Sequence, residues 1–250
     1  MLSAFVRVAL AESIKLRRTL ALRVALLAPL LVVVLYALLV HQRPALFRGR
    51  DDLWQSFAKS ICGLWALLML PLLVTLQAAL LAQLEHSDKQ WKDLFAQPVP
   101  RACYYLAKLL GAVLLAALST AVLWAGTFAA GRLLQLFRPE LNFAPAIPWA
   151  ALLLMTRILG LALLMIAIQH WVSLRWPSFT VAVGVGIAAV VTGFVLVNSD
   201  KFAPWYPWTL TAQAIAERPR TTVNSLAVSI AGFAIVTLAG AWHFSRREVE

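Results

Sequence analysis

Charged residues are scarce in this sequence, and acidic ones are the scarcest. Only 13% of its 250 residues are charged, with 11 Asp and Glu against 22 Lys and Arg, while 62% are hydrophobic. Soluble domains carry about 25% charged residues, so this composition excludes an ordinary soluble globule, and its hydrophobicity excludes a disordered chain. The net charge of +11 would suggest nucleic acid in a soluble protein, but here it indicates the anionic surface of a bilayer.

Catalytic and metal-binding patterns are missing as well. The four histidines do not pair with one another, with cysteine or with acids at the spacing of metal ligands. No serine or cysteine stands in a nucleophile elbow. In the topology derived below, Cys62 and Cys103 fall at opposite faces of the membrane, too far apart for a disulfide. We therefore predict no catalytic residue, no metal and no cofactor bound by this chain itself.

A nucleotide-binding loop is also absent. Residues 126–133 (GTFAAGRL) half-resemble a phosphate loop, but Arg132 and Leu133 stand where that motif needs Lys and then Ser or Thr. The segment also ends an apolar stretch instead of following a strand. We predict that the chain is not an enzyme and that any ATP hydrolysis takes place on another subunit.

What the sequence does contain is six long apolar stretches, at residues 20–40, 61–82, 109–130, 149–171, 179–197 and 223–242. Each has about the length of a helix that crosses the hydrocarbon core, and none alternates polar and apolar residues as a barrel strand would. The sequence therefore predicts an all-α polytopic membrane protein, with one transmembrane domain over residues 1–250 and six transmembrane helices. None of the stretches contains Asp or Glu, which argues against the ion relays of secondary transporters.

The orientation follows from the number of spans and from the basic residues. Six spans place both termini on one side of the membrane. That side carries a slight excess of Lys and Arg, and a basic cluster surrounds the start of the first span: Arg7, Lys15, Arg17, Arg18 and Arg23. Because positive charge stays inside, we expect both termini in the cytosol.

Residues 3–18 are predicted to form an interfacial helix. Basic residues recur on one helical face and apolar residues fall on the other: Arg7, Lys15 and Arg18 against Phe5, Val6, Ala9, Leu10 and Leu16. A helix of this kind lies in the headgroup plane with its cations toward lipid phosphates. The alternative is a basic anchor that only sets the orientation.

The loop between the second and third spans contains a short amphipathic helix at about residues 88–96. Trp91, Leu94 and Phe95 share one face of it, and Lys92 lies on the other. An exposed aromatic face of this kind fits a groove on a soluble partner. The alternative is that Trp91 only anchors the loop at the membrane interface.

A few polar residues fall inside the spans. Arg157 lies roughly 13 Å from the outer end of the fourth span; it either lines an inner cavity that attracts an anion or reaches outward to the surface or to a subunit interface. Thr75, Gln77 and Gln169 are expected to bridge helices, and Gly184 and Gly186 to allow close helix packing.

The stretch before the last span combines aromatic residues with prolines. Trp205, Tyr206 and Trp208 are interrupted by Pro204 and Pro207. Proline prevents a continuous helix, and the aromatic side chains suit the membrane interface. Residues 199–222 are therefore expected to form a kinked segment that is partly re-entrant or interfacial.

Several short motifs occur in a distinctive order along nearly the whole chain: residues 12–19 (ESIKLRRT), Glu85, residues 90–94 (QWKDL), 98–101 (PVPR), Lys108, 168–169 (IQ), Ser173, 178–179 (SF), 206–208 (YPW) and 244–247 (FSRR). This order resembles the permease subunits of type-2 ABC exporters, and most closely the branch of lantibiotic immunity and bacitracin resistance. The basic first outer loop, with Arg43, Arg48 and Arg50, departs from the pattern of that branch and leaves the substrate class open.

The resemblance implies a mechanism and partners. The helix around Trp91, with Lys92, Leu94 and Phe95, would be the coupling helix that seats in a separate ATPase subunit. Glu85 would brace this helix, with Lys108 as one partner. A second permease, either a copy of this chain or a relative, would complete the transporter. The substrate path or the interface between permeases would then be formed by polar and small residues of the spans: Thr75, Gln77, Arg157, Gln169, Gly184 and Gly186.

The predicted function is therefore that of a permease subunit in an ATP-driven exporter of a peptide, an antibiotic or a lipid-like molecule. ATP and magnesium would be bound by the partner ATPase. The Ala-, Leu- and Arg-rich composition fits a bacterial cytoplasmic membrane. A membrane sensor or scaffold without transport is the alternative, and an ATP-independent channel or carrier is a weaker one because the spans lack acids.

Overall fold

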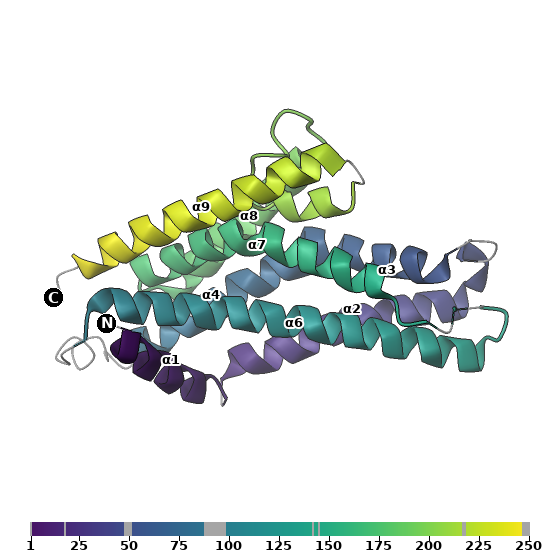
Figure 1. The fold of residues 1–250 in the computed structure, drawn as a ribbon, viewed down its shortest axis with the longest axis horizontal. Helices are drawn as coiled ribbons and strands as arrows, with labels where there is room; N and C mark the ends of the chain where they lie inside the picture. Colours follow the sequence, from purple (N-terminus) through teal and green to yellow (C-terminus); the bar gives the residue numbers. More distant parts are fainter. Residues whose placement is uncertain are drawn as a thin grey trace.

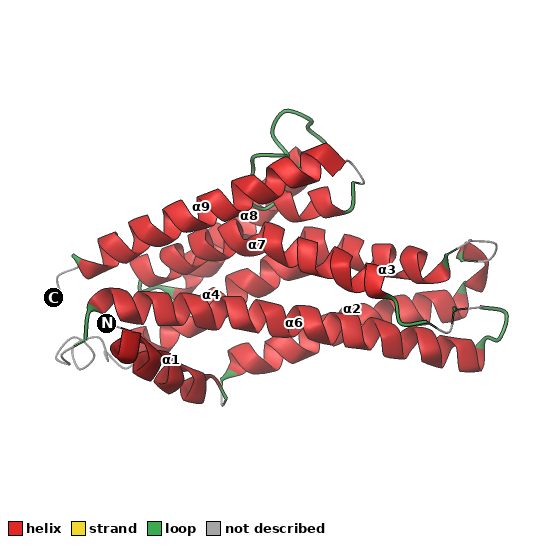
Figure 2. Cartoon of the chain, in the orientation of Figure 1, coloured by secondary structure: helices red, strands yellow, loops and turns green. Residues whose placement is uncertain are grey.

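A computed structural model describes residues 2–17, 19–47, 52–87, 99–141, 143–144, 146–216 and 219–246. In these ranges every regular element is a helix (Figure 2). The helices are, in chain order, α1 (Leu2–Leu16), α2 (Leu20–Gln42), η1 (Pro44–Leu46), α3 (Leu53–Leu64), η2 (Trp65–Met69), α4 (Leu70–Ser87), α6 (Arg101–Phe137), α7 (Trp149–Arg175), α8 (Phe179–Leu196), η3 (Leu210–Ala214) and α9 (Pro219–Ser245).

Six of these helical segments are long and apolar enough to cross a membrane: 20–42, 53–84, 101–137, 149–175, 179–196 and 224–245. The predicted all-α polytopic fold with six transmembrane helices is thus confirmed. The second and third segments are longer than the apolar stretches that predicted them, because the helices continue into polar sequence at their ends. Both marked termini lie at one end of the bundle (Figure 1), which we call the inner end; the opposite end is the outer end.

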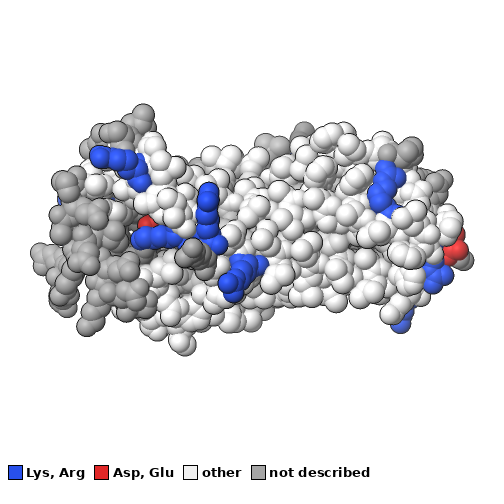
Figure 3. All heavy atoms as spheres, turned by 90° about the horizontal axis from the view of Figure 1, so that it is seen from below, with Lys and Arg blue, Asp and Glu red and all other residues white. Residues whose placement is uncertain are grey.

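The surface agrees with this arrangement. In the view of Figure 3, lysines, arginines and the few acids gather toward the two ends of the molecule, and a wide uncharged band separates them. Such a band is what a chain needs in order to face lipid hydrocarbon, because a charge at mid-membrane is costly.

Local sequence sets where several helices begin. Thr19 accepts a hydrogen bond from the backbone N–H of Leu22 and caps α2, Asp52 caps α3 through the N–H of Gln55, and Ser178 caps α8. Pro100 directly precedes α6, where its fixed φ and missing N–H do no harm. Short polar residues at these positions satisfy N–H groups that the first helical turn leaves without partners.

The long helices α6 and α7 form the centre of the bundle. α2 and α1 pack along α6, whereas α4 and α9 pack along α7. Large buried side chains of this core come from α3, α6 and α7, among them Phe57, Tyr105, Leu123 and Met155. α8 and α9 lie on the outside of the bundle and expose most of their side chains.

Helix α1, the predicted interfacial helix, places its apolar residues differently from the prediction. Its apolar residues do not share one environment: Phe5, Ala9 and Leu16 pack against the core, whereas Val6 and Leu10 are exposed together with Ile14. The physical reason is that α1 has two apolar sides, one of which covers α6, and amphipathic spacing cannot distinguish a protein-facing side from a lipid-facing one.

Candidate functional site

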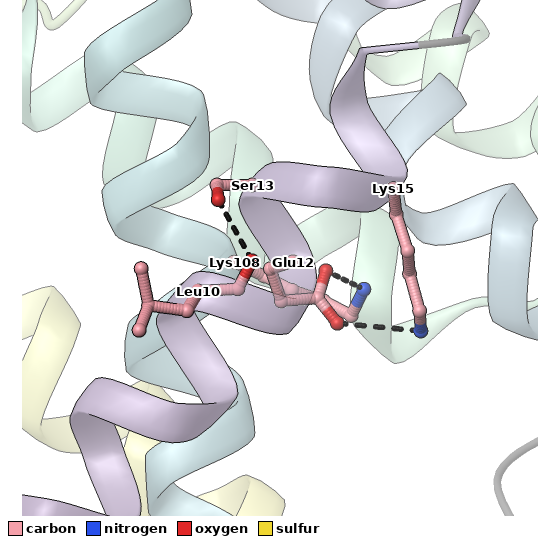
Figure 4. A network of polar contacts seen from close by, with 5 residues as sticks. All are labelled: Leu10, Glu12, Ser13, Lys15 and Lys108. Carbon is pink, nitrogen blue, oxygen red and sulfur yellow. Dashed lines mark hydrogen bonds and ion pairs between the residues drawn. The ribbon is translucent and has the colours of Figure 1, made fainter.

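A buried ion pair joins α1 to α6 at the inner end. The Lys108 ammonium donates to Glu12 Oε2 at 2.8 Å, and the Lys15 ammonium lies 3.5 Å from Glu12 Oε1 (Figure 4). Lys108 is only 2% exposed and Glu12 6%. Burying two charges is costly, so the pair persists only because each charge neutralises the other in close geometry. We call Glu12, Lys15 and Lys108 the inner junction.

The inner junction lies close along the chain to the loop that joins α4 to α6. Lys108 follows the first residue of α6, Arg101, by seven positions, which is about 10 Å of helix. The predicted coupling residues Trp91, Lys92, Leu94 and Phe95 lie outside the described residues. Glu85 falls in the last turns of α4, but its side chain also lies outside the description, so its suggested contact with Lys108 stays a prediction.

The structure describes two of the three basic residues of the predicted interfacial helix. Arg7 is exposed on α1, as expected for a cation near lipid headgroups. Lys15 instead turns toward Glu12, a contact that the amphipathic spacing of the basic residues does not predict. Arg18 lies outside the described residues.

Next to the inner junction, α6, α7 and α9 meet around one tyrosine. The backbone carbonyl of Tyr105 lies 3.2 Å from Nε2 of the buried His170. Because a carbonyl can only accept, Nε2 must carry the hydrogen. The tyrosine ring packs against His170 and Phe244, and a Cβ on Gly240 would collide with its hydroxyl. The start of α6 is therefore fixed on this side as well.

The uncharged polar residues predicted within the spans are buried on α4 and α7. Thr75, Gln77 and Gln169 are almost fully buried inside the chain. Gln169 Nε2 donates to the carbonyl of Ala182 at 2.8 Å. Gly186 packs directly on Thr75, where any Cβ would clash. Gln169 thus bridges α7 and α8 as expected, and Gly186 allows the predicted close packing.

The hydrogen bonding of these three side chains is incomplete. Within the described part of the chain, Thr75 Oγ1, Gln77 Nε2 and Gln169 Oε1 have no hydrogen-bond partner. A buried polar atom without a partner costs about 1–3 kcal/mol. Their burial within one subunit favours contacts between its own helices; a role in a substrate path or at a permease interface stays a prediction.

At the outer end, the segment between α8 and α9 folds back into the bundle. η3 packs on α7 and on the π turn η2, and its Leu210 and Thr211 have no exposed surface. The Thr211 hydroxyl donates to the carbonyl of Ala66, within η2, at 2.7 Å. The Tyr206 hydroxyl donates to the carbonyl of Ala189 on α8 at 2.9 Å, and burial raises the pKa of this phenol, which keeps it a donor. We call residues 197–216 the re-entrant segment.

A cavity of about 760 Å³ is lined by residues of the re-entrant segment and of α9. Its walls combine amide and carboxylate groups with apolar side chains, including Asn198, Asp200, Gln213 and Asn224 beside Val197 and Trp205. Its volume falls within the range of small-molecule sites. Neither the cavity nor the π turn was predicted from the sequence, although the prolines indicated the re-entrant path.

The family assignment rests on most of the chain. Residues 9–195, which are 187 of 250, match the model of a family described as ABC-2 family transporter protein. The chain belongs to the ABC-2 transporter family. A comparison with curated proteins gives no match.

Membership of the ABC-2 family indicates the type of subunit and the type of partner. An ABC-2 permease is a membrane subunit and is not itself the ATPase, and the family implies an ABC ATPase partner in general. The matched residues include α1 from position 9, the inner junction, and Thr75, Gln77 and Gln169. The re-entrant segment lies beyond the matched residues.

Two further predicted residues of this permease lie on its surface. Gly184 is exposed on α8 with open space beside it, and Arg157 is exposed on α7. The core-facing side of α7 is formed by apolar residues such as Met155 and Ile158, and Arg157 lies away from this side. Its suggested roles, in a cavity that attracts an anion or at the surface or a subunit interface, stay predictions.

Proposed function

We propose that this chain is the transmembrane permease subunit of an ATP-driven exporter, with ATP and magnesium bound by a separate ATPase subunit. Its membership of the ABC-2 family and its six apolar helices support this proposal. The predicted coupling residues Glu85, Trp91, Lys92, Leu94 and Phe95 would receive the movement of the ATPase.

The observation that carries the proposal is the buried ion pair between Glu12 and Lys108. α6 continues as one helix from the end of the inner loop to the outer end of the bundle. A displacement of the loop would therefore move α6 as a rod, and the ion pair would make α1 follow. An arrangement of this kind suits a subunit that is driven from its inner side.

The remaining parts of the proposal concern partners and substrate. A second permease, the same chain or a homologue, would pack against exposed α8, where Gly184 permits close approach. The exposed Val6, Leu10 and Ile14 of α1 would enter the lipid surface. The membrane would be a bacterial cytoplasmic membrane with both termini in the cytosol. The substrate would be a peptide, an antibiotic or a lipid-like molecule, as in lantibiotic immunity and bacitracin resistance.

The proposal is tested by purifying the chain from its native cell in mild detergent, identifying co-purifying subunits by mass spectrometry and measuring ATP hydrolysis. We expect an ATPase subunit in near-equal amount. Trp91→Ala and Glu85→Ala should still insert but lose partner-stimulated hydrolysis, whereas Trp176→Ala, an exposed inner-end tryptophan outside the loop, should keep it. Unchanged hydrolysis in all three variants would refute the coupling role.

The same preparation separates the alternative functions. An ATPase partner together with resistance or signalling, but without measurable flux, would identify a sensor or scaffold. Flux through the purified chain alone, driven only by an ion gradient, would identify a channel or carrier. Either outcome would contradict the exporter proposal.

A further inference from the structure

Arg157 is an exposed cation on the side of α7 that faces away from the core. It forms no hydrogen bond, ion pair or ring contact with any residue that the structure describes. Its neighbours on the same exposed side are apolar: Leu153, one turn earlier, is 53% exposed and Trp149, two turns earlier, is 62% exposed. A guanidinium keeps its charge at any physiological pH, so it cannot lower the cost of this position by losing a proton.

The position of Arg157 along the bundle follows from α7 itself and from its contacts with α9. It follows the first residue of α7 by eight positions, or about 12 Å of helix. α9 runs alongside α7 in the same direction: Leu226 approaches Gly160, and the Ser229 hydroxyl donates to the carbonyl of Gly160 at 2.9 Å. Arg157 therefore lies about one turn outward of this contact.

No side chain that the structure describes supplies an anion at this level. The described carboxylates outside the inner junction are Asp52, Glu140 and Asp200, and none of them is a partner of Arg157. An uncompensated arginine facing hydrocarbon is unfavourable. None of the described carboxylates therefore compensates this charge.

We propose that Arg157 binds the phosphate of an outer-leaflet phospholipid at the edge between α7 and α9. The guanidinium presents paired N–H donors that match phosphate oxygens, and its long side chain can reach toward the headgroups. Trp149 lies on the same side of α7 nearer the outer end, a position in which tryptophan favours the membrane interface. The apolar surface of Leu153 suits the acyl chains of the same lipid.

The site is tested by native mass spectrometry of the purified full chain in detergent, titrated with phosphatidylglycerol or phosphatidylcholine. We expect Arg157→Leu to weaken retention of phospholipid about five- to tenfold, which corresponds to roughly 1–1.4 kcal/mol. Arg157→Lys should be intermediate, because it keeps the charge but loses the paired donors. Arg175→Leu, which removes an exposed arginine at the inner end beside Trp176, is the matched control and should retain lipid at this site.

The outcomes separate the sources of the anion. Competition by millimolar inorganic phosphate in the wild type, but not in Arg157→Leu, would support a phosphate site and assign it to free phosphate as well as lipid. Lipid retention by Arg157→Leu equal to that of the wild type would overturn the proposal. A change from dimer to monomer in Arg157→Leu, without loss of lipid, would also overturn it, because Arg157 would then contact a second copy. Thermal denaturation of each variant establishes that it is folded, and none of these measurements depends on an ATPase.

Discussion

At the inner end of this ABC-2 permease a buried ion pair holds α1 to α6, whereas at the outer end neutral hydrogen bonds hold the re-entrant segment to α8 and to the π turn. The two attachments differ in the groups that would lose their partners if the contact were broken. Separating Glu12 from Lys108 would break the contact between two buried charges and leave the carboxylate with the more distant Lys15. Separating Thr211 from Ala66 would strand only a hydroxyl and a carbonyl.

This difference suggests that the two ends have different mechanical roles. A charged attachment that is costly to break is suited to transmitting force, because it moves as a unit with its helices. A neutral attachment at a π turn, a feature frequent at functional sites, is suited to opening. We therefore expect the inner junction to stay intact during any working cycle and the re-entrant segment to open more readily.

The largest expected effect is that of Lys108→Met at the inner junction. It leaves the Glu12 carboxylate buried without its main partner, and we expect a loss of about 3–5 kcal/mol in stability. Thermal denaturation in detergent, with helix content followed by circular dichroism, measures it. The double variant Glu12→Leu/Lys108→Met should recover most of the loss, because it removes both charges. A single variant as stable as Lys201→Met, an outer-loop control, would show that the ion pair does not hold the inner end.

The corresponding change at the outer end is Thr211→Val. It removes the hydroxyl donor while keeping the shape of the side chain, and it leaves the buried Ala66 carbonyl unpaired. We expect a cost of about 1–3 kcal/mol, seen first as faster hydrogen exchange in the re-entrant segment and only then as a lower melting temperature. Thr211→Ser keeps the donor and should exchange like the wild type. Equal protection in Thr211→Val would mean that packing, not this hydrogen bond, keeps the segment closed.

Between the two ends, the contact of Gly186 with Thr75 tests whether the middle of the bundle is rigid. Gly186→Val would drive side-chain atoms into Thr75, and overpacking of this kind costs about 1–3 kcal/mol. Gly184→Val, two residues away in open space, should change the melting temperature little. Equal melting temperatures for both variants would mean that α8 can move away from α4 at little cost. The middle of the bundle would then not be rigid.

Sequence reasoning was strong where the physics is local. Six spans could be predicted because length and hydropathy are properties of each segment by itself, and the prolines around Tyr206 indicated the re-entrant path. It was weak where the partners are far apart in the chain. Glu12 and Lys108 are 96 residues apart, and Ala66 and Thr211 are 145 apart; no spacing rule connects them. Arg157 shows a third case, because its position along the span follows from the sequence, whereas the side of α7 on which it lies does not.

The smallest expected effect is that of Lys15→Met, the more exposed partner of Glu12. Its ammonium lies 3.5 Å from Glu12 Oε1 and remains partly exposed, so water and salt screen the attraction. We expect a loss of at most about 1 kcal/mol, which should shrink further when melting is repeated at high salt. Lys108→Met should keep its larger loss in the same salt series, because its site is shielded from solvent. A Lys15→Met variant as unstable as Lys108→Met, and equally insensitive to salt, would mean that the inner junction is a network of three charges and not a buried pair with an exposed neighbour.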